Sequence, residues 1–185
     1  MLMKTICIFL AEGFEEIEAI TPIDVLRRAG IPVETVSIMD DLAVKGAHGV
    51  PVVADKLFEE VKEDDIEMIL LPGGLPGATN LFSHKGLKEM IMHFAAEQKP
   101  LSAICAAPFI YGHHGLLAGK KATCYPGFES HLKGAEYTAA LVQSDGNYIT
   151  AKGPGAALAF AFAIVEKYCG ADTVGDLKKG MIVES

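Results

Sequence analysis

The chain has 185 residues, half of them apolar, and its 16 basic and 24 acidic side chains give a formal net charge of −8. This length suits one domain with a sizeable core, so we expect residues 1–185 to form a single domain. The acidic balance disfavours a nucleic-acid or anionic-membrane partner, because both bind basic surfaces.

The start of the chain does not have the pattern of an export signal. The apolar run of residues 6–11 is short and leads directly to Glu12, whereas a signal peptide has a basic start and a longer apolar stretch. No segment approaches the ~18 apolar residues of a membrane span. We therefore expect a cytoplasmic protein with no membrane partner, whose four cysteines remain free thiols.

Short apolar strands alternate with helices along the chain. We predict strands at residues 4–10, 33–38, 50–54, 67–71, 101–104, 121–124, 141–143 and 148–150. We predict helices at residues 16–29 (broken near Pro22), 85–98, 105–117, 153–168 and 171–179. Repeated strand–helix units with continuous apolar strands favour an α/β fold, a mostly parallel sheet covered on both faces. Sites in such sheets form beyond the carboxyl ends of the strands.

One of these strand ends carries a cysteine. Cys105 follows the predicted strand 101–104, and the small residues Ala106 and Ala107 precede Pro108. Small neighbours allow a sharp turn from strand to helix, as in a nucleophile elbow. At a helix N-terminus, free N–H groups and the helix dipole favour a thiolate. The alternative is a buried core cysteine that packs like a small apolar residue.

A glycine-rich loop, PGGLPGA, follows the predicted strand 67–71. Consecutive Gly73 and Gly74 allow the backbone to approach a ligand closely. If the loop faces the cysteine turn, its N–H groups and that of Ala106 form an oxyanion hole. The alternative is a plain connection between strand and helix.

Glu18 differs from the three glutamates that precede it, because Ile17, Ala19 and Ile20 surround it in the sequence. A carboxyl group in an apolar setting is desolvated and keeps its proton near neutral pH. The alternative is a fourth solvated glutamate at the start of a helix.

Four segments together resemble the ThiJ/PfpI superfamily, and most closely its branch with the parkinsonism-linked protein deglycase and its bacterial relatives. They are AEGFEEIEAITPIDVLRRAGI (11–31), LLPGGLPGATNL (70–81), AICAAP (103–108) and TAKGPGAALAFAFAIVE (150–166). The segments follow in order over nearly the whole chain. Their combination is specific, although each segment alone is not.

The resemblance implies a flavodoxin-like three-layer sandwich and a homodimer. It assigns the nucleophile to Cys105 and a protonated glutamate, hydrogen-bonded to the cysteine sulfur, to Glu18. It assigns the oxyanion-type backbone donors to Gly74 and Ala106, with Gly73 as a neighbour of the site.

Two positions depart from the family's branches. The protease-like branch has a histidine directly after the nucleophile, where this chain has Ala106, so a Cys–His protease lacks its adjacent base. The human-type branch has a histidine near the site, where this chain has Tyr125, a poor general base with a reference pKa of about 10. Tyr125 and, in a following loop, His131 are candidate neighbours of the site.

We expect no cofactor and no metal. The cysteines form no CxxC pair, and no P-loop or other nucleotide motif occurs. Some family members carry a thiazole-biosynthesis label, but this sequence gives no support for a thiazole kinase. His113 and His114 are adjacent and therefore point to different faces of a helix, which is poor geometry for zinc.

Three functions remain open. In the first, the protein is a stress-response enzyme of the deglycase or glyoxalase type: Cys105 attacks a small reactive carbonyl or a glycated protein, and Glu18 moves a proton. In the second, it is a redox-sensing chaperone whose Cys105 oxidises to a sulfinate held by Gly74 and Ala106. The third, a Cys–His–Glu amidotransferase, requires a histidine within hydrogen-bond reach of Cys105.

Overall fold

The computed structural model describes residues 3–183, and a seven-stranded sheet lies at its centre. The strand order is β10-β11-β7-β6-β1-β2-β5. The strands are β1 (Thr5–Leu10), β2 (Val33–Ser37), β5 (Lys56–Leu57), β6 (Ile66–Leu71), β7 (Leu101–Ile104), β10 (Val142–Asp145) and β11 (Tyr148–Ala151). Every neighbouring pair is parallel except β10 and β11, which confirms the expected mostly parallel sheet.

Two short strand pairs lie outside this sheet. β3 (Ala43–Lys45) pairs with β4 (Pro51–Val53) in an antiparallel hairpin, and β8 (Lys121–Ala122) pairs with β9 (Glu136–Tyr137). The predicted strands 50–54 and 121–124 therefore form, shortened, but they do not join the main sheet. Their partners, β3 and β9, were not predicted, because these short segments lack the continuous apolar run that identifies a central strand.

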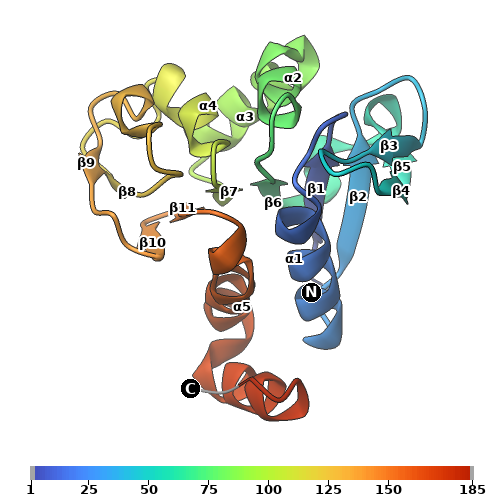
Figure 1. Cartoon of the computed structure of the whole chain (residues 1–185), viewed down its shortest axis with the longest axis vertical. Coiled ribbons are helices and arrows are strands. Elements are labelled where there is room, and N and C mark those ends of the chain that lie inside the picture. Colours follow the sequence, from blue (N-terminus) through green and yellow to red (C-terminus); the bar gives the residue numbers. More distant parts are fainter. Residues whose placement is uncertain (1–2, 184–185) are drawn as a thin grey trace.

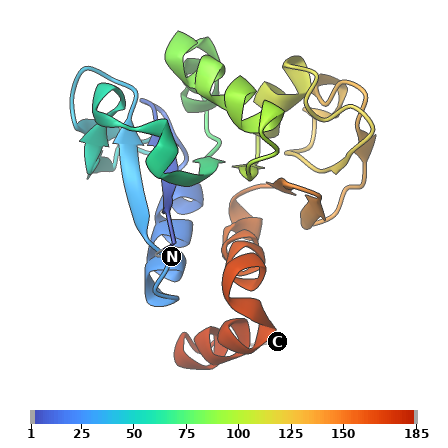
Figure 2. The ribbon, with the colours of Figure 1, turned by 180° about the vertical axis from the view of Figure 1, so that it is seen from behind.

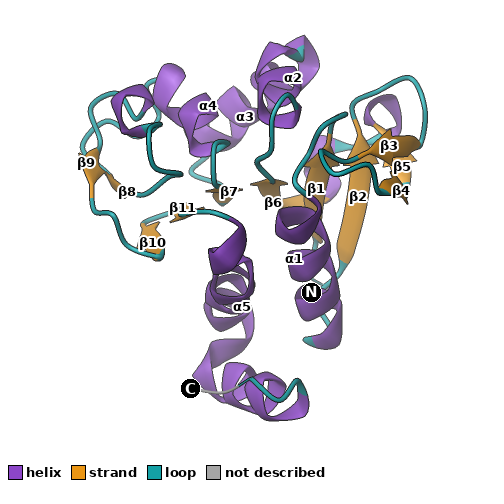
Figure 3. Cartoon of the chain, viewed as in Figure 1, coloured by secondary structure: helices purple, strands orange, loops and turns teal. Residues whose placement is uncertain are grey.

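Helices cover both faces of the sheet, as Figures 1 and 3 show. α1 (Glu16–Arg28) and α5 (Ala157–Gly180) pack side by side on one face, and α2 (Gly77–Ser83), α3 (Lys85–Ala96) and α4 (Pro108–His113) cover the other. Successive side chains of β1 alternate between these layers. Ile6 and Ile8 belong to the core under α1 and α5, whereas Cys7 and Phe9 belong to the core on the opposite face. The fold is therefore a three-layer sandwich.

Helix α1 runs through Pro22, so the predicted break is wrong. Proline lacks the N–H that would bond the carbonyl of Glu18, and its ring costs about 3 kcal/mol or more inside a helix. Pro22, Val25 and Leu26 are buried between the sheet and α5. This packing offsets the lost hydrogen bond and keeps the helix continuous.

The C-terminal helices agree with the prediction of two helices. α5 bends at Gly170, whose φ of 82° and ψ of 168° are not helical, so two helical parts meet at the predicted break between residues 168 and 171. The first part begins at Ala157 and not at residue 153, because Pro154–Ala156 form a 3-10 turn. Figure 2 shows from behind how the part after this bend turns toward the lower end of α1. In the part of the chain that the structure covers, no helix combines the length and apolar character of a bilayer span.

The strand order reverses at the carboxyl end of β1. The chain passes from β1 to β2 on one side and later returns to β6 on the other side of β1. In open α/β sheets, ligands bind where the strand order reverses in this way, beyond the carboxyl ends of the strands. The loops after β1, β6 and β7 meet at this position.

Candidate functional site

The cysteine after β7 lies on a strained turn. Cys105 has a φ of 66°, in the left-handed region that residues with a side chain rarely occupy. Its N–H donates to the carbonyl of Ala151 (2.9 Å), and its own carbonyl accepts from the N–H of Tyr125 (2.8 Å). These bonds hold a conformation that costs roughly 1–3 kcal/mol. α4 therefore begins at Pro108, and not at Cys105 as predicted, because residues 105–107 form the elbow.

The glycine-rich loop after β6 approaches this elbow closely. A Cβ atom on Gly73 would lie 2.7 Å from the Cβ of Cys105 and 2.7 Å from Oε2 of Glu18. Gly74 has a φ of 84°, and a side chain there would collide with the backbone N of Glu15. Only glycine fits both positions, so these residues allow the loop, the cysteine and the glutamate to meet.

Glu18 lies in the first turn of α1 and is completely buried. Its Oε2 accepts the N–H of Gly73 at 2.8 Å, and its Oε1 has no hydrogen-bond partner among residues 3–183. Burial raises its pKa to about 7, against the opposing effects of the Cys105 thiol and the Gly73 N–H; the charge of Glu15 raises it further. A buried oxygen without a donor suits a carboxyl group that carries its proton.

The expected desolvation of Glu18 is present, but its cause differs from the one proposed from the sequence. Ile17 and Ile20 are about half exposed and do not shield the carboxyl group. Sequence neighbours one and two positions away lie on other faces of a helix. The glycine loop and Cys105 bury Glu18 instead.

The thiol of Cys105 is only 8% exposed. Burial, as the largest cause, and Glu18 together raise its pKa to about 12, although the N–H groups of Ala106 and Gly74 act to lower it. The position of Cys105 at a strand-to-helix turn suggested an acidic thiol, but the turn alone does not lower its pKa. Burial also raises the pKa of the Cys7 and Cys124 thiols to about 12, so Cys105 does not differ from them in this respect. A proton on Glu18 would remove the repelling charge, so the ionisations of Cys105 and Glu18 are coupled.

The two candidate neighbours occupy different places. Tyr125 borders the elbow through its backbone N–H, while its ring packs against Gly153. His131 lies instead beside α4, where its Nδ1 is 3.0 Å from Nε2 of His113. No hydrogen bond joins His131 to Cys105 or Glu18 in the described structure, so its proposed approach to the site is not observed.

None of the six histidines hydrogen-bonds Cys105 within residues 3–183. His48 contacts Glu16, His84 caps α3, and His93 approaches Glu63. His113 and His131 contact each other, and His114 stacks on Phe82. The requirement for a Cys–His–Glu amidotransferase is therefore not met in the described structure.

Sequence reasoning missed a part of the site formed by residues 151–156. Ala151 accepts the N–H of Cys105, and the following residues line a cavity of about 280 Å³ together with Tyr125, Pro126 and Leu141. The signal was present, because this segment begins the fourth stretch of family resemblance; its Gly-Pro-Gly sequence is typical of a helix start, whose N–H groups can cap the helix or bind an anion.

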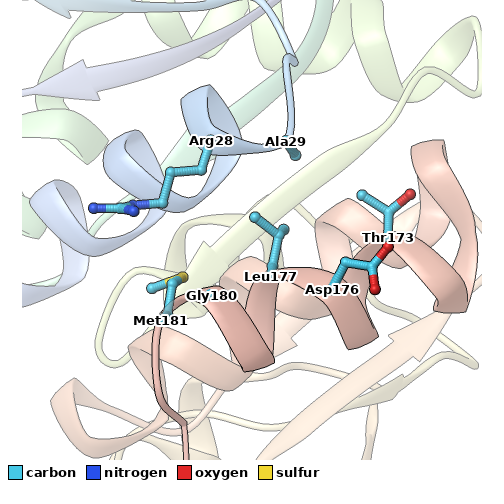
Figure 4. A pocket seen from close by; sticks show the side chains of 7 residues that line it. All are labelled: Arg28, Ala29, Thr173, Asp176, Leu177, Gly180 and Met181. Carbon is cyan, nitrogen blue, oxygen red and sulfur yellow. The ribbon is translucent and has the colours of Figure 1, made fainter.

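A second cavity, of about 420 Å³, lies far from this cysteine. Arg28 and Ala29 of α1 and Leu177 and Met181 of α5 are among the residues that line it (Figure 4). Arg28 is ten residues after Glu18 along α1, a separation of about 15 Å along the helix axis. No cysteine lines this cavity, so it is not part of the site.

Residues 4–167 match the model of the DJ-1/PfpI family. This chain belongs to that family. It is 42% identical over 175 residues to protein DJ-1 homolog B of Arabidopsis thaliana, and 35% identical over 188 residues to the Parkinson disease protein 7 homolog of Danio rerio. These matches cover 94% and 100% of this chain, but 40% and 100% of the relatives, so the chain spans less than half of the plant protein.

Solved structures agree with this assignment. Drosophila melanogaster DJ-1beta has a TM-score of 0.92 at 34% identity, and each chain is covered completely. An oxidized Toxoplasma gondii DJ-1 has a TM-score of 0.93 at 32% identity, with 98% of this chain and all of that chain covered. The resemblance and the flavodoxin-like fold are thus confirmed.

The raised pKa of Glu18 predicts a pH-dependent contribution to stability. Below pH 4.5 the carboxyl is protonated in the folded and unfolded chains; between pH 4.5 and 7 only the folded chain keeps the proton. The free energy of unfolding should therefore fall, relative to Glu18→Gln, by on the order of 3 kcal/mol as the pH rises through this interval. Urea unfolding of both proteins at several pH values measures the difference, and a pH-independent difference would contradict the assignment.

Proposed function

We propose that this protein is a cysteine-dependent enzyme that acts on small reactive carbonyls, as a glutathione-independent glyoxalase or a protein deglycase. The observation that carries the proposal is the buried Glu18 carboxyl, with an unpartnered oxygen and a pKa near 7, beside a cysteine on a strained elbow. A nucleophile and a proton-transfer group are thus in contact. The free cysteines of the chain suit a reducing, cytoplasmic compartment.

Addition to the carbonyl is the first step. The thiolate of Cys105 attacks the aldehyde carbon, so that a sulfur–carbon bond forms and the carbonyl π electrons move to oxygen. That oxygen takes the proton of Glu18. The N–H groups of Gly74 and Ala106, which already face the thiol, are the donors available to stabilise the developing negative charge.

The same carboxylate then acts as a base. Glu18 removes the hydrogen from the carbon that carries sulfur and returns that proton to the neighbouring carbon. Through the ene-diol, the hydroxyl proton passes from the oxygen of the first carbon to the oxygen of the second, so the first carbon becomes the thioester carbonyl. The product is a 2-hydroxy thioester, which water cleaves to a 2-hydroxy acid and the free thiol of Cys105. The net reaction adds one water to a 2-oxoaldehyde and needs no oxidant. A pKa near 7 suits a group that both gives and takes a proton at neutral pH.

Redox sensing is a second candidate function, and the N–H groups of Gly74 and Ala106 favour it. Two hydrogen peroxide molecules would convert the Cys105 thiol to a sulfinic acid and release two waters, and these donors can hold the anion. Cys7 and Cys124 are buried and all four cysteines are free, so no disulfide partner competes in the described structure.

A homodimer is part of the proposal, because one face carries exposed apolar side chains. Ile17 and Ile20 project from α1, and Val50 and Val53 lie on the β3–β4 hairpin. Glu16 of α1 accepts the N–H of Val50, which joins the two elements into one surface. Exposed apolar patches of this kind mark interaction surfaces.

Turnover of methylglyoxal to lactate by the purified protein tests the enzymatic proposal. Cys105→Ala should abolish it, and Glu18→Gln, which keeps a donor but cannot accept the proton, should lower kcat by ~10²-fold or more. Cys169→Ala, which removes an exposed cysteine on α5, serves as the control and should retain full activity. Full activity in Glu18→Gln would show that Glu18 has only a structural role.

Mild peroxide treatment followed by peptide mass mapping tests the redox alternative. Two oxygen atoms should be added at Cys105 before any other cysteine, because its neighbours supply N–H donors to the product. A Cys105–Cys124 disulfide as the main product would refute sulfinate formation and make Cys124 the resolving thiol.

Light scattering at micromolar concentration tests the dimer. The unmodified chain should have twice the monomer mass, and the double substitution Ile17→Glu with Val53→Asp should be monomeric, because it places charges in the apolar face. Met92→Asp, at an exposed apolar residue of α3, is the matched control and should leave the dimer intact. A monomer mass for the unmodified chain would contradict the proposal.

A further inference from the structure

We propose that the cavity beside the cysteine elbow is a substrate subsite for an apolar arm that ends in a carboxylate, and that Lys152 recognises the negative end. This inference rests on the proposed function, because the arm belongs to the carbonyl substrate that Cys105 would attack. The cavity measures about 280 Å³. Its lining comprises Tyr125, Pro126, Leu141, Lys152, Gly153, Pro154, Gly155 and Ala156.

Both walls of this cavity are attached to the peptide groups of Cys105. On one side, the N–H of Tyr125 donates to the Cys105 carbonyl at 2.8 Å. On the other side, the N–H of Cys105 donates to the carbonyl of Ala151 at 2.9 Å, and Ala151 directly precedes Lys152. The walls cannot move away from the elbow without breaking a hydrogen bond of the cysteine. A group bound here is therefore held at a constant position relative to the nucleophile.

The lining favours an apolar arm. Tyr125 and Leu141 are 45% and 54% exposed, and both present apolar surface to the cavity that they line. Pro126 and Pro154 add further apolar surface, and the Tyr125 ring lies against Gly153, where a Cβ would be 3.1 Å from Cδ2. Ligand pockets typically combine such surfaces with few polar groups. At about 280 Å³, the cavity suits a short aliphatic chain.

Lys152 supplies the charge for the other end of the arm. Its ammonium makes a single long hydrogen bond, 3.5 Å to the carbonyl of Ala139, and takes part in no ion pair within residues 3–183. Glu129 is the acidic group near it, but its carboxylate accepts the N–H of Gly127 at 2.9 Å. A lysine free to turn toward the cavity can therefore pair with a carboxylate. Lys152 is the charged side chain of this lining, and a single cation suits a singly charged carboxylate better than a phosphate.

Protection of Cys105 from alkylation tests the subsite without any turnover. Iodoacetamide is uncharged, so removing a lysine does not change its attraction to the protein. Hexanoate should slow the alkylation of Cys105, and its apparent affinity should fall by ~10-fold or more in Lys152→Gln, because a charge-assisted hydrogen bond is lost. Lys85→Gln, on α3, loses the same charge and should behave as the unmodified protein. Hexanol should protect both variants equally.

Turnover supplies the second arm of the experiment. For a 2-oxoaldehyde with an aliphatic arm ending in a carboxylate, Lys152→Gln should raise KM by ~10-fold with kcat little changed, whereas kcat/KM for methylglyoxal should stay the same. Hexanoate protection that depends on Lys152, without turnover of any carbonyl, would support the subsite and contradict the proposed function. If the protein turns over methylglyoxal but Lys152→Gln changes neither the hexanoate protection nor the KM of the carboxylate substrate, the subsite proposal is wrong and the proposed function stands.

Discussion

The burial of one carboxyl group organises this protein. Glu18 has no exposed surface. One of its oxygens accepts the Gly73 N–H, and the other has no hydrogen-bond partner in the described part of the chain. An ionised carboxylate in this position would be poorly solvated, so the folded chain favours the protonated form. The close approach of the glycine loop, the turn after β7 and the start of α1 all serve to form this environment.

The chemistry of the cysteine follows from the same burial. Cys105 is only 8% exposed, and this burial raises the pKa of its thiol. The backbone N–H groups of Ala106 and Gly74 lower that pKa, but by less than burial raises it. Glu18 decides the balance, because its proton determines whether Cys105 faces a repelling charge or a hydrogen-bond donor. This differs from a Cys–His pair, in which a base removes the thiol proton.

The elbow connects two functional regions through the backbone. On one side, the glycine loop and Glu18 surround the thiol; on the other, Tyr125 and Ala151 hold the peptide groups of Cys105 and begin the walls of the neighbouring cavity. The strained φ of Cys105 is maintained by these same contacts. Under the proposed function, chemistry and recognition are both attached to Cys105, and Lys152 is the cation that lines the neighbouring cavity.

The sequence by itself determined the parallel sheet and the position of the nucleophile, since both depend on local patterns. Continuous apolar strands such as β1 and β6 are recognisable without a structure, and so are the small residues between β7 and Pro108 that permit a sharp turn. Sequence neighbours gave the wrong cause for the burial of Glu18, because Ile17 and Ile20 point outward from α1. They also suggested a break at Pro22, where packing against the sheet and α5 keeps the helix continuous.

Only the tertiary structure decided which loops meet at the cysteine. Gly73 reaches Glu18 across 55 residues of sequence, and Tyr125 borders the elbow while His131 turns away to His113. No local pattern contains these distances, because they depend on the strand order and on where each loop leaves the sheet. The pairing of Ala151 with the Cys105 N–H likewise follows from β11 lying beside β7. That adjacency, a property of the whole sheet, places Lys152 directly after the residue that holds the Cys105 N–H.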